Sequence, residues 1–126
     1  MIKRFILTLM AAALLLPQLS SAQELKVMSY NIRLGSGEDG TNSWIYRCPA
    51  TLEMLKDQAP DVFGVQEALP EQVRFLEEFA DGYEGVGVGR DDGKKNGEHM
   101  SIFWNKNNIN LMKWGTFWLS ETPEKP

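Results

Sequence analysis

The stretch Asp61–Glu67, with the sequence DVFGVQE, predicts the centre of the fold. It follows the turn signal Ala59-Pro60 and runs through β-branched and aromatic residues, a pattern typical of a buried strand. The stretch ends on a carboxylate, and a charge that closes a buried strand belongs at the rim of a sheet. Because open α/β sheets bind ligands at the carboxyl ends of their strands, Glu67 is the first candidate site residue.

A second stretch, Leu25–Asn31 with the sequence LKVMSYN, is also predicted to be a strand and also ends on a polar residue. A loop over 33–42 and a predicted helix over Trp44–Gln58 separate the two strands, which is the layout of a βαβ unit. Parallel neighbours end at the same edge of a sheet, so we expect Asn31 and Glu67 to stand side by side. An amide and a carboxylate together predict a site for a hard cation, Mg²⁺ or Mn²⁺.

The rest of the chain predicts a further helix and further strands. The helix is expected from Pro70 to about Phe79. A strand is expected over 84–89, where GVGVG lacks the spacing of a phosphate-binding loop and indicates close backbone packing. Glu98–Lys106 and Asn110–Leu119 are expected to form an antiparallel pair joined through Asn107-Asn108. In the earlier helix, Pro49 is compatible only with the first turn.

Two of these stretches, taken together, resemble the motifs of a known family. SYNIR at 29–33 and PDVFGVQE at 60–67 are similar to the first two motifs of the endonuclease/exonuclease/phosphatase superfamily, and GTFWLSETP at 115–123 resembles a segment of its secreted bacterial branch. The resemblance covers roughly residues 25–126. It implies an α/β (α+β) chain that forms the amino-terminal half of a four-layer α-β-β-α sandwich, the deoxyribonuclease-I-like fold.

The resemblance also implies roles for three residues. Glu67 matches the metal-binding Glu of the family, which implies a Mg²⁺ or Mn²⁺ ligand; the alternative is a rim carboxylate that caps the helix beginning at Pro70. Asn31 matches the Asn that helps to place the scissile phosphate, and its alternative is a turn residue at a strand end. Glu98 matches a Glu that orients a catalytic His in the deoxyribonuclease branch, so it joins Asn31 as a candidate catalytic residue.

Four other side chains carry two interpretations each. Arg90 is either a substrate-binding residue that forms a forked pair with phosphate or a solvated loop residue. Trp114 and Trp118 would share one face of a strand, where they either pack in the core or form a stacking platform for a sugar, inositol or base. His99 is the only histidine and so the obvious candidate for the general base of hydrolysis. Neighbouring side chains of a strand face opposite ways, however, so His99 cannot share a site with Glu98 and is not expected to be that base.

Residues 1–22 have the layout of a secretory signal peptide, with a basic start, an apolar run over 5–16 and small residues before Gln23. The apolar run is shorter than the ~20 residues that span a bilayer. We therefore expect a product that comprises residues 23–126, the truncated amino-terminal part of the family domain. It is expected to be periplasmic or extracellular, with no stable membrane association after cleavage.

Charge and cysteine content narrow the possible functions. The chain has a net charge of −4, and removal of the basic signal segment makes the product more acidic still. Apart from the short region Arg90–Lys95 there is no basic cluster, which argues against processive nucleic-acid binding. Cys48 is alone, so no internal disulfide can form.

The resemblance, with the signal-like segment, implies an exported, Mg²⁺-dependent hydrolase of phosphomonoesters or phosphodiesters, acting on a small phosphorylated molecule or on nucleic acid. The later Asp-x-Asn and Ser-Asp-His motifs of the family do not occur in this sequence, so we expect the chain by itself to be inactive. The alternative is a non-catalytic secreted binding module on the same fold. Nothing in the sequence indicates an oligomeric state.

Overall fold

A computed structural model describes residues 23–36 and 38–126 of the chain. The predicted signal peptide over 1–22 lies outside these residues. Within the part of the chain that the structure describes, none of the helices is both long enough and apolar enough to span a bilayer.

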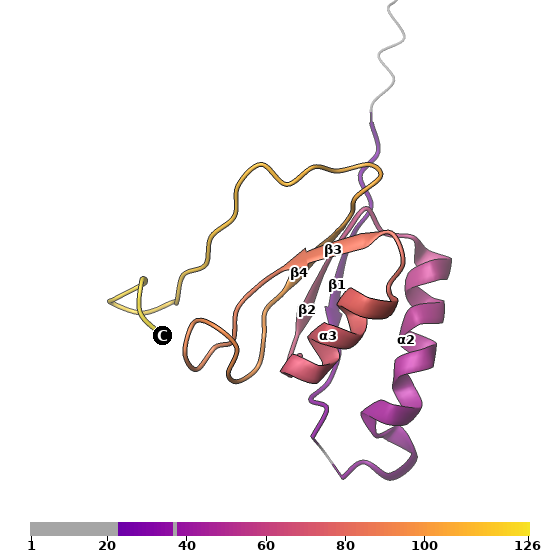
Figure 1. The fold of residues 1–126 in the computed structure, drawn as a ribbon, viewed down its shortest axis with the longest axis horizontal. Helices are drawn as coiled ribbons and strands as arrows, with labels where there is room; N and C mark the ends of the chain where they lie inside the picture. The colour runs from indigo at the N-terminus through magenta and orange to yellow at the C-terminus, as the bar shows by residue number, and fades with distance from the viewer. Residues whose placement is uncertain (1–22, 37) are drawn as a thin grey trace, which may run out of the picture.

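The described residues form one four-stranded sheet with the strand order β1-β2-β4-β3 (Figure 1). The strands are β1 (Val27–Asn31), β2 (Val62–Gln66), β3 (Tyr83–Val86) and β4 (Ile102–Asn105). β1 and β2 run parallel, whereas β4 runs antiparallel to both β2 and β3. The predicted βαβ unit is confirmed, and β3 lies at the edge of the sheet.

Two α-helices, α2 (Trp44–Gln58) and α3 (Pro70–Phe79), cover one face of the sheet, and the short 3-10 helix η1 (Gly40–Asn42) precedes α2. Both α-helices have the bounds that the sequence predicts. The core lies between the helices and the sheet, and its fully buried side chains include Ile32, Leu76 and the pair Phe63 and Phe103. The rings of that pair stack 4.9 Å apart.

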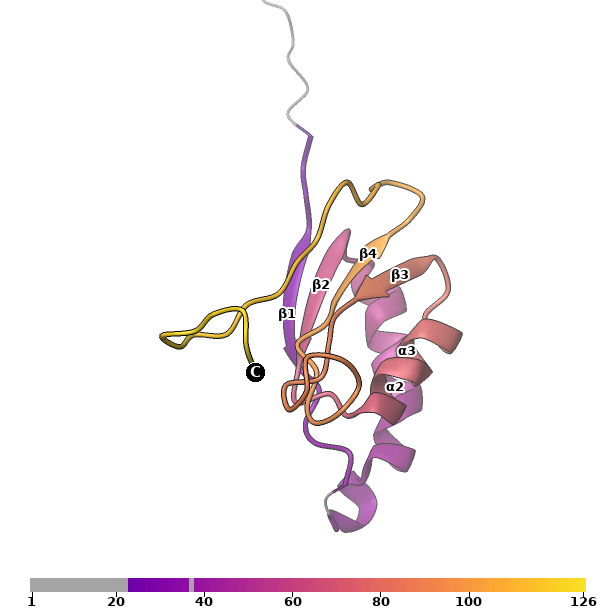
Figure 2. The same cartoon turned by 60° about the vertical axis from the view of Figure 1, so that its left-hand side comes forward.

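The opposite face of the sheet is partly open. Side chains alternate along a strand, so Val27 on β1 and Ile102 on β4 point away from the helices and are 65% and 53% exposed. The segment after β4 runs along this side, apart from both helices (Figure 2). The described residues therefore form two layers, one of helices and one of sheet, in a mixed α/β arrangement. The outer face of the sheet is apolar and only partly covered.

The predicted strand over Asn110–Leu119 is wrong, because the structure places no strand there. The reason is the position of β4, which is paired with β2 on one side and β3 on the other and has no free edge for a hairpin partner. β4 is also shorter than predicted. Of residues 98–101, His99 alone makes isolated bridges, opposite Ala68 and Gly89.

The expected position of Pro49 in the first turn of its helix is also wrong, because α2 begins at Trp44 and places Pro49 in the second turn. Proline has no N–H to offer the carbonyl of Ile45. The thiol of Cys48 donates to that carbonyl instead, at 3.5 Å. Cys48 is buried and free, and this weak contact partly offsets the missing backbone bond.

The glycines of GVGVG permit close packing, as the sequence predicts. A Cβ on Gly85 would lie 2.5 Å from the ring of Phe103, and a Cβ on Gly87 would lie 2.3 Å from Oγ of Ser101. No side chain fits in either space without displacing its neighbour. The two glycines therefore allow β3 and the residue that follows it to pack directly against the side chains of Phe103 and Ser101.

Candidate active site

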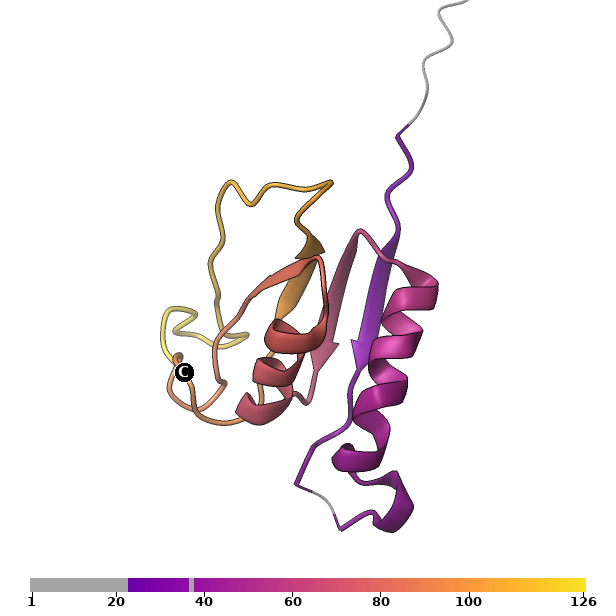
Figure 3. The ribbon, with the colours of Figure 1, turned by 45° about the vertical axis from the view of Figure 1, so that its right-hand side comes forward.

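The strands β1 and β2 end at the same edge of the sheet (Figure 3). Asn31 and Glu67 meet at this edge. The two strands run parallel in register, so that Asn31 pairs with Gln66 and the next residue, Glu67, lies beside it. The side-chain amide Nδ2 of Asn31 donates to Oε1 of Glu67 at 2.8 Å. Their predicted placement side by side is confirmed, and their catalytic and metal-binding roles stay predictions.

The backbone turns sharply just beyond both strand ends. Arg33 and Glu67 are non-glycine residues with φ angles of 61° and 60°, in the left-handed region. Such conformations cost free energy, and they are found most often where a functional site holds the chain in place. The turn after β1 also sets the orientation of the Asn31 amide, because Oδ1 accepts from the Arg33 N–H at 2.9 Å and Nδ2 is thereby left to face Glu67.

The carboxylate of Glu67 is held in its ionised form. Hydrogen bonds from the Asn31 amide and from the backbone N–H of Leu34 lower the pKa of Glu67, and the nearby positive charge of Arg33 adds to the effect. Arg33 is itself held by a forked pair to Asp39, with contacts of 2.8 and 2.7 Å. A carboxylate that stays anionic and sits at an open sheet edge is suited to binding a cation.

Glu67 does not cap α3, which removes the alternative for this residue. The residue that precedes α3 is Leu69, and its backbone N–H donates to Oε1 of Gln72 at 3.0 Å. Both oxygens of Glu67 are directed instead to the turn after β1, toward Asn31 and Leu34. The carboxylate thus belongs to the strand-end site rather than to the helix.

Sequence reasoning missed Gln72, which holds the two sides of this site together. It is fully buried, and while its Oε1 accepts from Leu69, its Nε2 donates to the carbonyl of Arg33 at 2.9 Å. One side chain on α3 therefore fixes the turns that follow both β1 and β2. The available signal was its position three residues after Leu69, where a Gln often bonds back to the residue before a helix.

Arg47 on α2 supports the same segment from the other side and was also missed. Its Nη1 donates to the carbonyl of Ile32 and its Nε to that of Asn42, both at 2.6 Å. The guanidinium lies 5.5 Å from the ring centre of Trp44. No local motif in the sequence indicates these long-range contacts.

Glu98 and Arg90 pair with each other, on a segment whose next residue, His99, bridges Ala68 directly after Glu67. The guanidinium of Arg90 makes two contacts with the Glu98 carboxylate, at 3.2 and 3.3 Å, and the backbone N–H of Arg90 donates to the carbonyl of Glu98. The predicted alternation of side chains is confirmed, since Met100 is 68% exposed while His99 is 6% exposed. Their suggested roles, in orienting a catalytic His and in binding phosphate, stay predictions.

The two tryptophans of the segment after β4 do not share a strand face, because no strand forms there. Trp114 is 48% exposed and lies beside the sheet. Trp118 is half-buried, and its indole N–H donates to the carbonyl of Arg90 at 3.3 Å. This bond joins Trp118 to the loop that follows Arg90, and a stacking role for the two tryptophans stays a prediction.

The donor set fits one mode of divalent-cation binding. Among residues 23–36 and 38–126 no group of three His, Cys, Asp or Glu side chains lies close enough to enclose a metal ion. Mg²⁺ is commonly held by one or two carboxylates, with waters and substrate phosphate completing its shell. Glu67, beside the amide of Asn31, fits that open type of site and not an all-protein cage.

No protein-family model and no curated protein matches this chain. Solved structures do match. An endonuclease/exonuclease/phosphatase family protein from Bacteroides thetaiotaomicron is 41% identical over 81% of this chain, with a TM-score of 0.77. A mannosyl-6-phosphatase from the same species is 41% identical over 82%, with a TM-score of 0.78. An endonuclease/exonuclease/phosphatase from Bacteroides vulgatus is 36% identical over 82%, also with a TM-score of 0.78.

The fold is the one shared by these endonuclease/exonuclease/phosphatase and phosphatase structures. This chain belongs to the endonuclease/exonuclease/phosphatase family. It spans 37%, 39% and 40% of the lengths of the three similar structures. The sequence motifs around Asn31 and Glu67 and the three-dimensional fold thus indicate the same family.

Proposed function

We propose that this chain supplies the metal-binding edge of an exported phosphoester hydrolase that depends on Mg²⁺ or Mn²⁺. The observation that carries the proposal is the 2.8 Å hydrogen bond between Asn31 and Glu67 at the carboxyl ends of two parallel strands. Family membership supports the reaction class, because one similar structure is a mannosyl-6-phosphatase. The signal-like layout of residues 1–22 supports export.

In this proposal Glu67 would hold the cation. When bound, a divalent ion supplies positive charge that stabilises the phosphate and the leaving oxygen. The chain's own contribution is to keep the carboxylate ionised, through the bonds from Asn31 and Leu34, and to fix its direction. Asn31 would place the phosphate, since its amide is oriented by the turn at Arg33.

The described residues do not place a general base beside Glu67. His99 is 6% exposed, and its Nδ1 bonds to the carbonyl of Gly97, on the other side of its segment from Glu98. A carbonyl only accepts hydrogen bonds, so Nδ1 carries a proton there. The proposal therefore requires a base from the part of the family fold that this chain does not span, and it leaves His99 out of the chemistry at the strand ends.

A small phosphorylated molecule is the proposed substrate class. The chain is acidic, with a net charge of −4, and its acidity disfavours the long phosphate tracks that nucleic acids present. The mannosyl-6-phosphatase among the similar structures acts on a substrate of this small class by its name. Nucleic acid is the second candidate substrate, because the family includes nucleases.

The experiment compares substrates with the exported, complete gene product, whose intact mass should show Gln23 as its first residue. Phosphate release from mannose 6-phosphate and cleavage of a single-stranded oligonucleotide are measured with Mg²⁺ and after chelation. We expect metal-dependent release of phosphate and slow or no DNA cleavage. Tight binding of either compound without turnover under any metal would favour the non-catalytic binding module and contradict the proposed hydrolase.

A further inference from the structure

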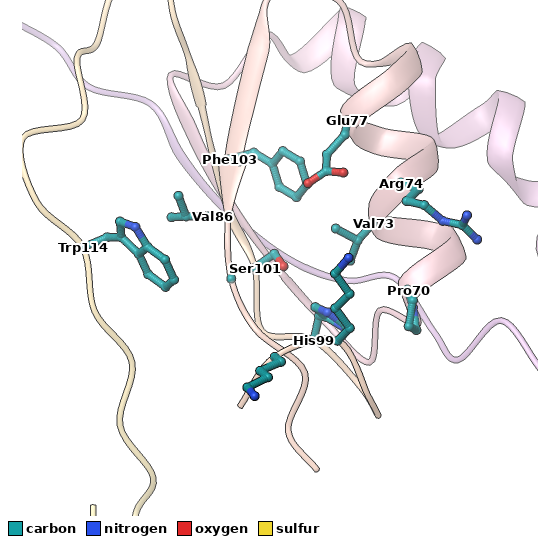
Figure 4. A pocket seen from close by; sticks show the side chains of 13 residues that line it. Pro70, Val73, Arg74, Glu77, Val86, His99, Ser101, Phe103 and Trp114 are labelled. Atoms are coloured by element: carbon teal, nitrogen blue, oxygen red, sulfur yellow. The ribbon is translucent and has the colours of Figure 1, made fainter. Parts of the chain in front are cut away.

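A pocket lies between α3 and the side of the sheet formed by β3 and β4 (Figure 4). Its volume is about 630 Å³, within the range of small-molecule sites. We propose that this pocket binds a hydroxylated organic phosphate of about the size of a hexose phosphate. The pocket is separate from the strand-end site, since neither Asn31 nor Glu67 lines it.

The rim of the pocket is cationic. Arg74 on α3 and the neighbours Lys94 and Lys95 line it, whereas Glu77 is the one acid among the lining residues. None of these three cationic side chains forms an ion pair or donates a hydrogen bond within the described part of the chain. Unpaired cations grouped around a hollow raise the local concentration of anions.

The loop that carries the two lysines is held by its own backbone contacts. Oδ1 of Asp92 accepts from three successive N–H groups, those of Lys94, Lys95 and Asn96, at 2.8, 3.0 and 3.0 Å. These bonds lower the pKa of Asp92, so the carboxylate stays ionised and keeps the turn closed. The ammonium groups take no part in holding the loop and are available to a ligand.

The inner end of the pocket contains a polar group without a partner. Ser101 is 2% exposed, and its Oγ is the one buried side-chain oxygen or nitrogen of the described residues that has no hydrogen bond. It packs against Gly87, which has no side chain to offer. An unpaired buried hydroxyl costs free energy, so a ligand hydroxyl or phosphate oxygen that reached it would relieve that cost.

The walls between rim and inner end are apolar and aromatic. Figure 4 shows Trp114 on one side of Ser101, with Val73 and Pro70 of the α3 region on the other and Phe103 above. Trp114 is 48% exposed, so its ring is available to the apolar face of a sugar. The pocket therefore has cationic side chains at its rim, an aromatic wall and the unpaired hydroxyl of Ser101 at its inner end. These groups complement a ligand that is anionic at one end and carries hydroxyl groups along the rest of its length.

The test measures binding of mannose 6-phosphate to the complete gene product by calorimetry in the presence of a chelator, in a Glu67→Gln background. These conditions remove the cation and its carboxylate ligand from the strand-end site, and the location variants below separate binding in the pocket from any binding that Asn31 still supports. Mannose and inorganic phosphate are titrated separately. We expect one site for mannose 6-phosphate and weaker binding of each half alone, because the pocket contacts both ends of the ligand.

Three variants test whether the ligand binds in this pocket. The double variant Lys94→Gln/Lys95→Gln should weaken binding at least about 10-fold, through loss of two charges. The double variant Lys56→Gln/Lys125→Gln removes the same charge elsewhere and should leave it unchanged. Ser101→Ala should weaken binding several-fold while raising the melting temperature, since its hydroxyl has no partner in the protein.

Absence of binding in the chelated Glu67→Gln protein would overturn the proposal. An unchanged affinity in the Ser101→Ala protein would also overturn it, because the ligand would then contact only the lysines at the rim. A Ser101→Ala protein with a lowered melting temperature would likewise count against it, by showing that the hydroxyl has a structural partner.

Discussion

Replacement of Glu67 by Gln should reduce the metal-dependent hydrolysis of a phosphate ester by the complete gene product on the order of 10²-fold or more. The substitution removes the one anionic oxygen ligand at the strand-end site and keeps its size. Gln still offers an oxygen to the Asn31 amide, so the fold should be retained. Initial rates across a Mg²⁺ titration should show both a lower maximum and a higher metal requirement.

The matched control for this variant is Glu71→Gln. Glu71 is exposed in the first turn of α3, a few residues along the chain, and its loss changes the net charge by the same amount. It should leave the rate and the metal requirement unchanged. Equal losses in both variants would show that overall charge, and not ligation by Glu67, determines the activity.

Replacement of Gln72 by Leu should be the most destabilising of the substitutions considered, with a loss of about 2–4 kcal/mol in the free energy of unfolding. Leucine has a similar volume, so the loss comes from polar groups rather than from a cavity. The N–H of Leu69 would lose its partner, and the carbonyl of Arg33 would keep only the 3.4 Å bond from Nη2 of Arg47, beneath a fully buried side chain. Urea denaturation followed by tryptophan fluorescence gives the change.

The same substitution at an exposed glutamine serves as a control for the loss of the buried hydrogen bonds. Gln58 ends α2 and is exposed, so Gln58→Leu should shift the free energy of unfolding by no more than about 0.5 kcal/mol. Because Gln72 holds the turns that follow both site strands, its loss should also lower the rate in the protein that remains folded. A Gln72→Leu protein as stable as the parent would mean that water or another side chain takes over both bonds.

Local patterns in the sequence predicted most of the fold. The apolar runs before Asn31 and Glu67 correspond to β1 and β2, and the predicted bounds of α2 and α3 match the structure. The side-by-side placement of Asn31 and Glu67 followed from one geometric rule, that parallel neighbours end at the same edge. These features depend on side-chain periodicity and on the parallel pairing of two neighbouring strands.

The features that sequence reasoning missed depend on long-range pairing. The residues of Asn110–Leu119 have strand-like composition, yet β4 lies inside the sheet and offers no edge to them. The bond from Gln72 to the carbonyl of Arg33 joins residues that are 39 positions apart, and no periodicity encodes it. The position of Pro49 is a local feature by contrast, and there the thiol of Cys48 donates weakly to the carbonyl that proline leaves without its backbone donor.

Anomalous scattering from Mn²⁺ in crystals of the complete gene product would show whether Glu67 and Asn31 mark a cation site. We expect one strong peak at coordination distance, about 2.0–2.2 Å, from a carboxylate oxygen of Glu67. The peak should disappear in Glu67→Gln crystals. A peak at another acidic group, such as Asp91 and Asp92, with none beside Glu67, would show that the cation site lies elsewhere.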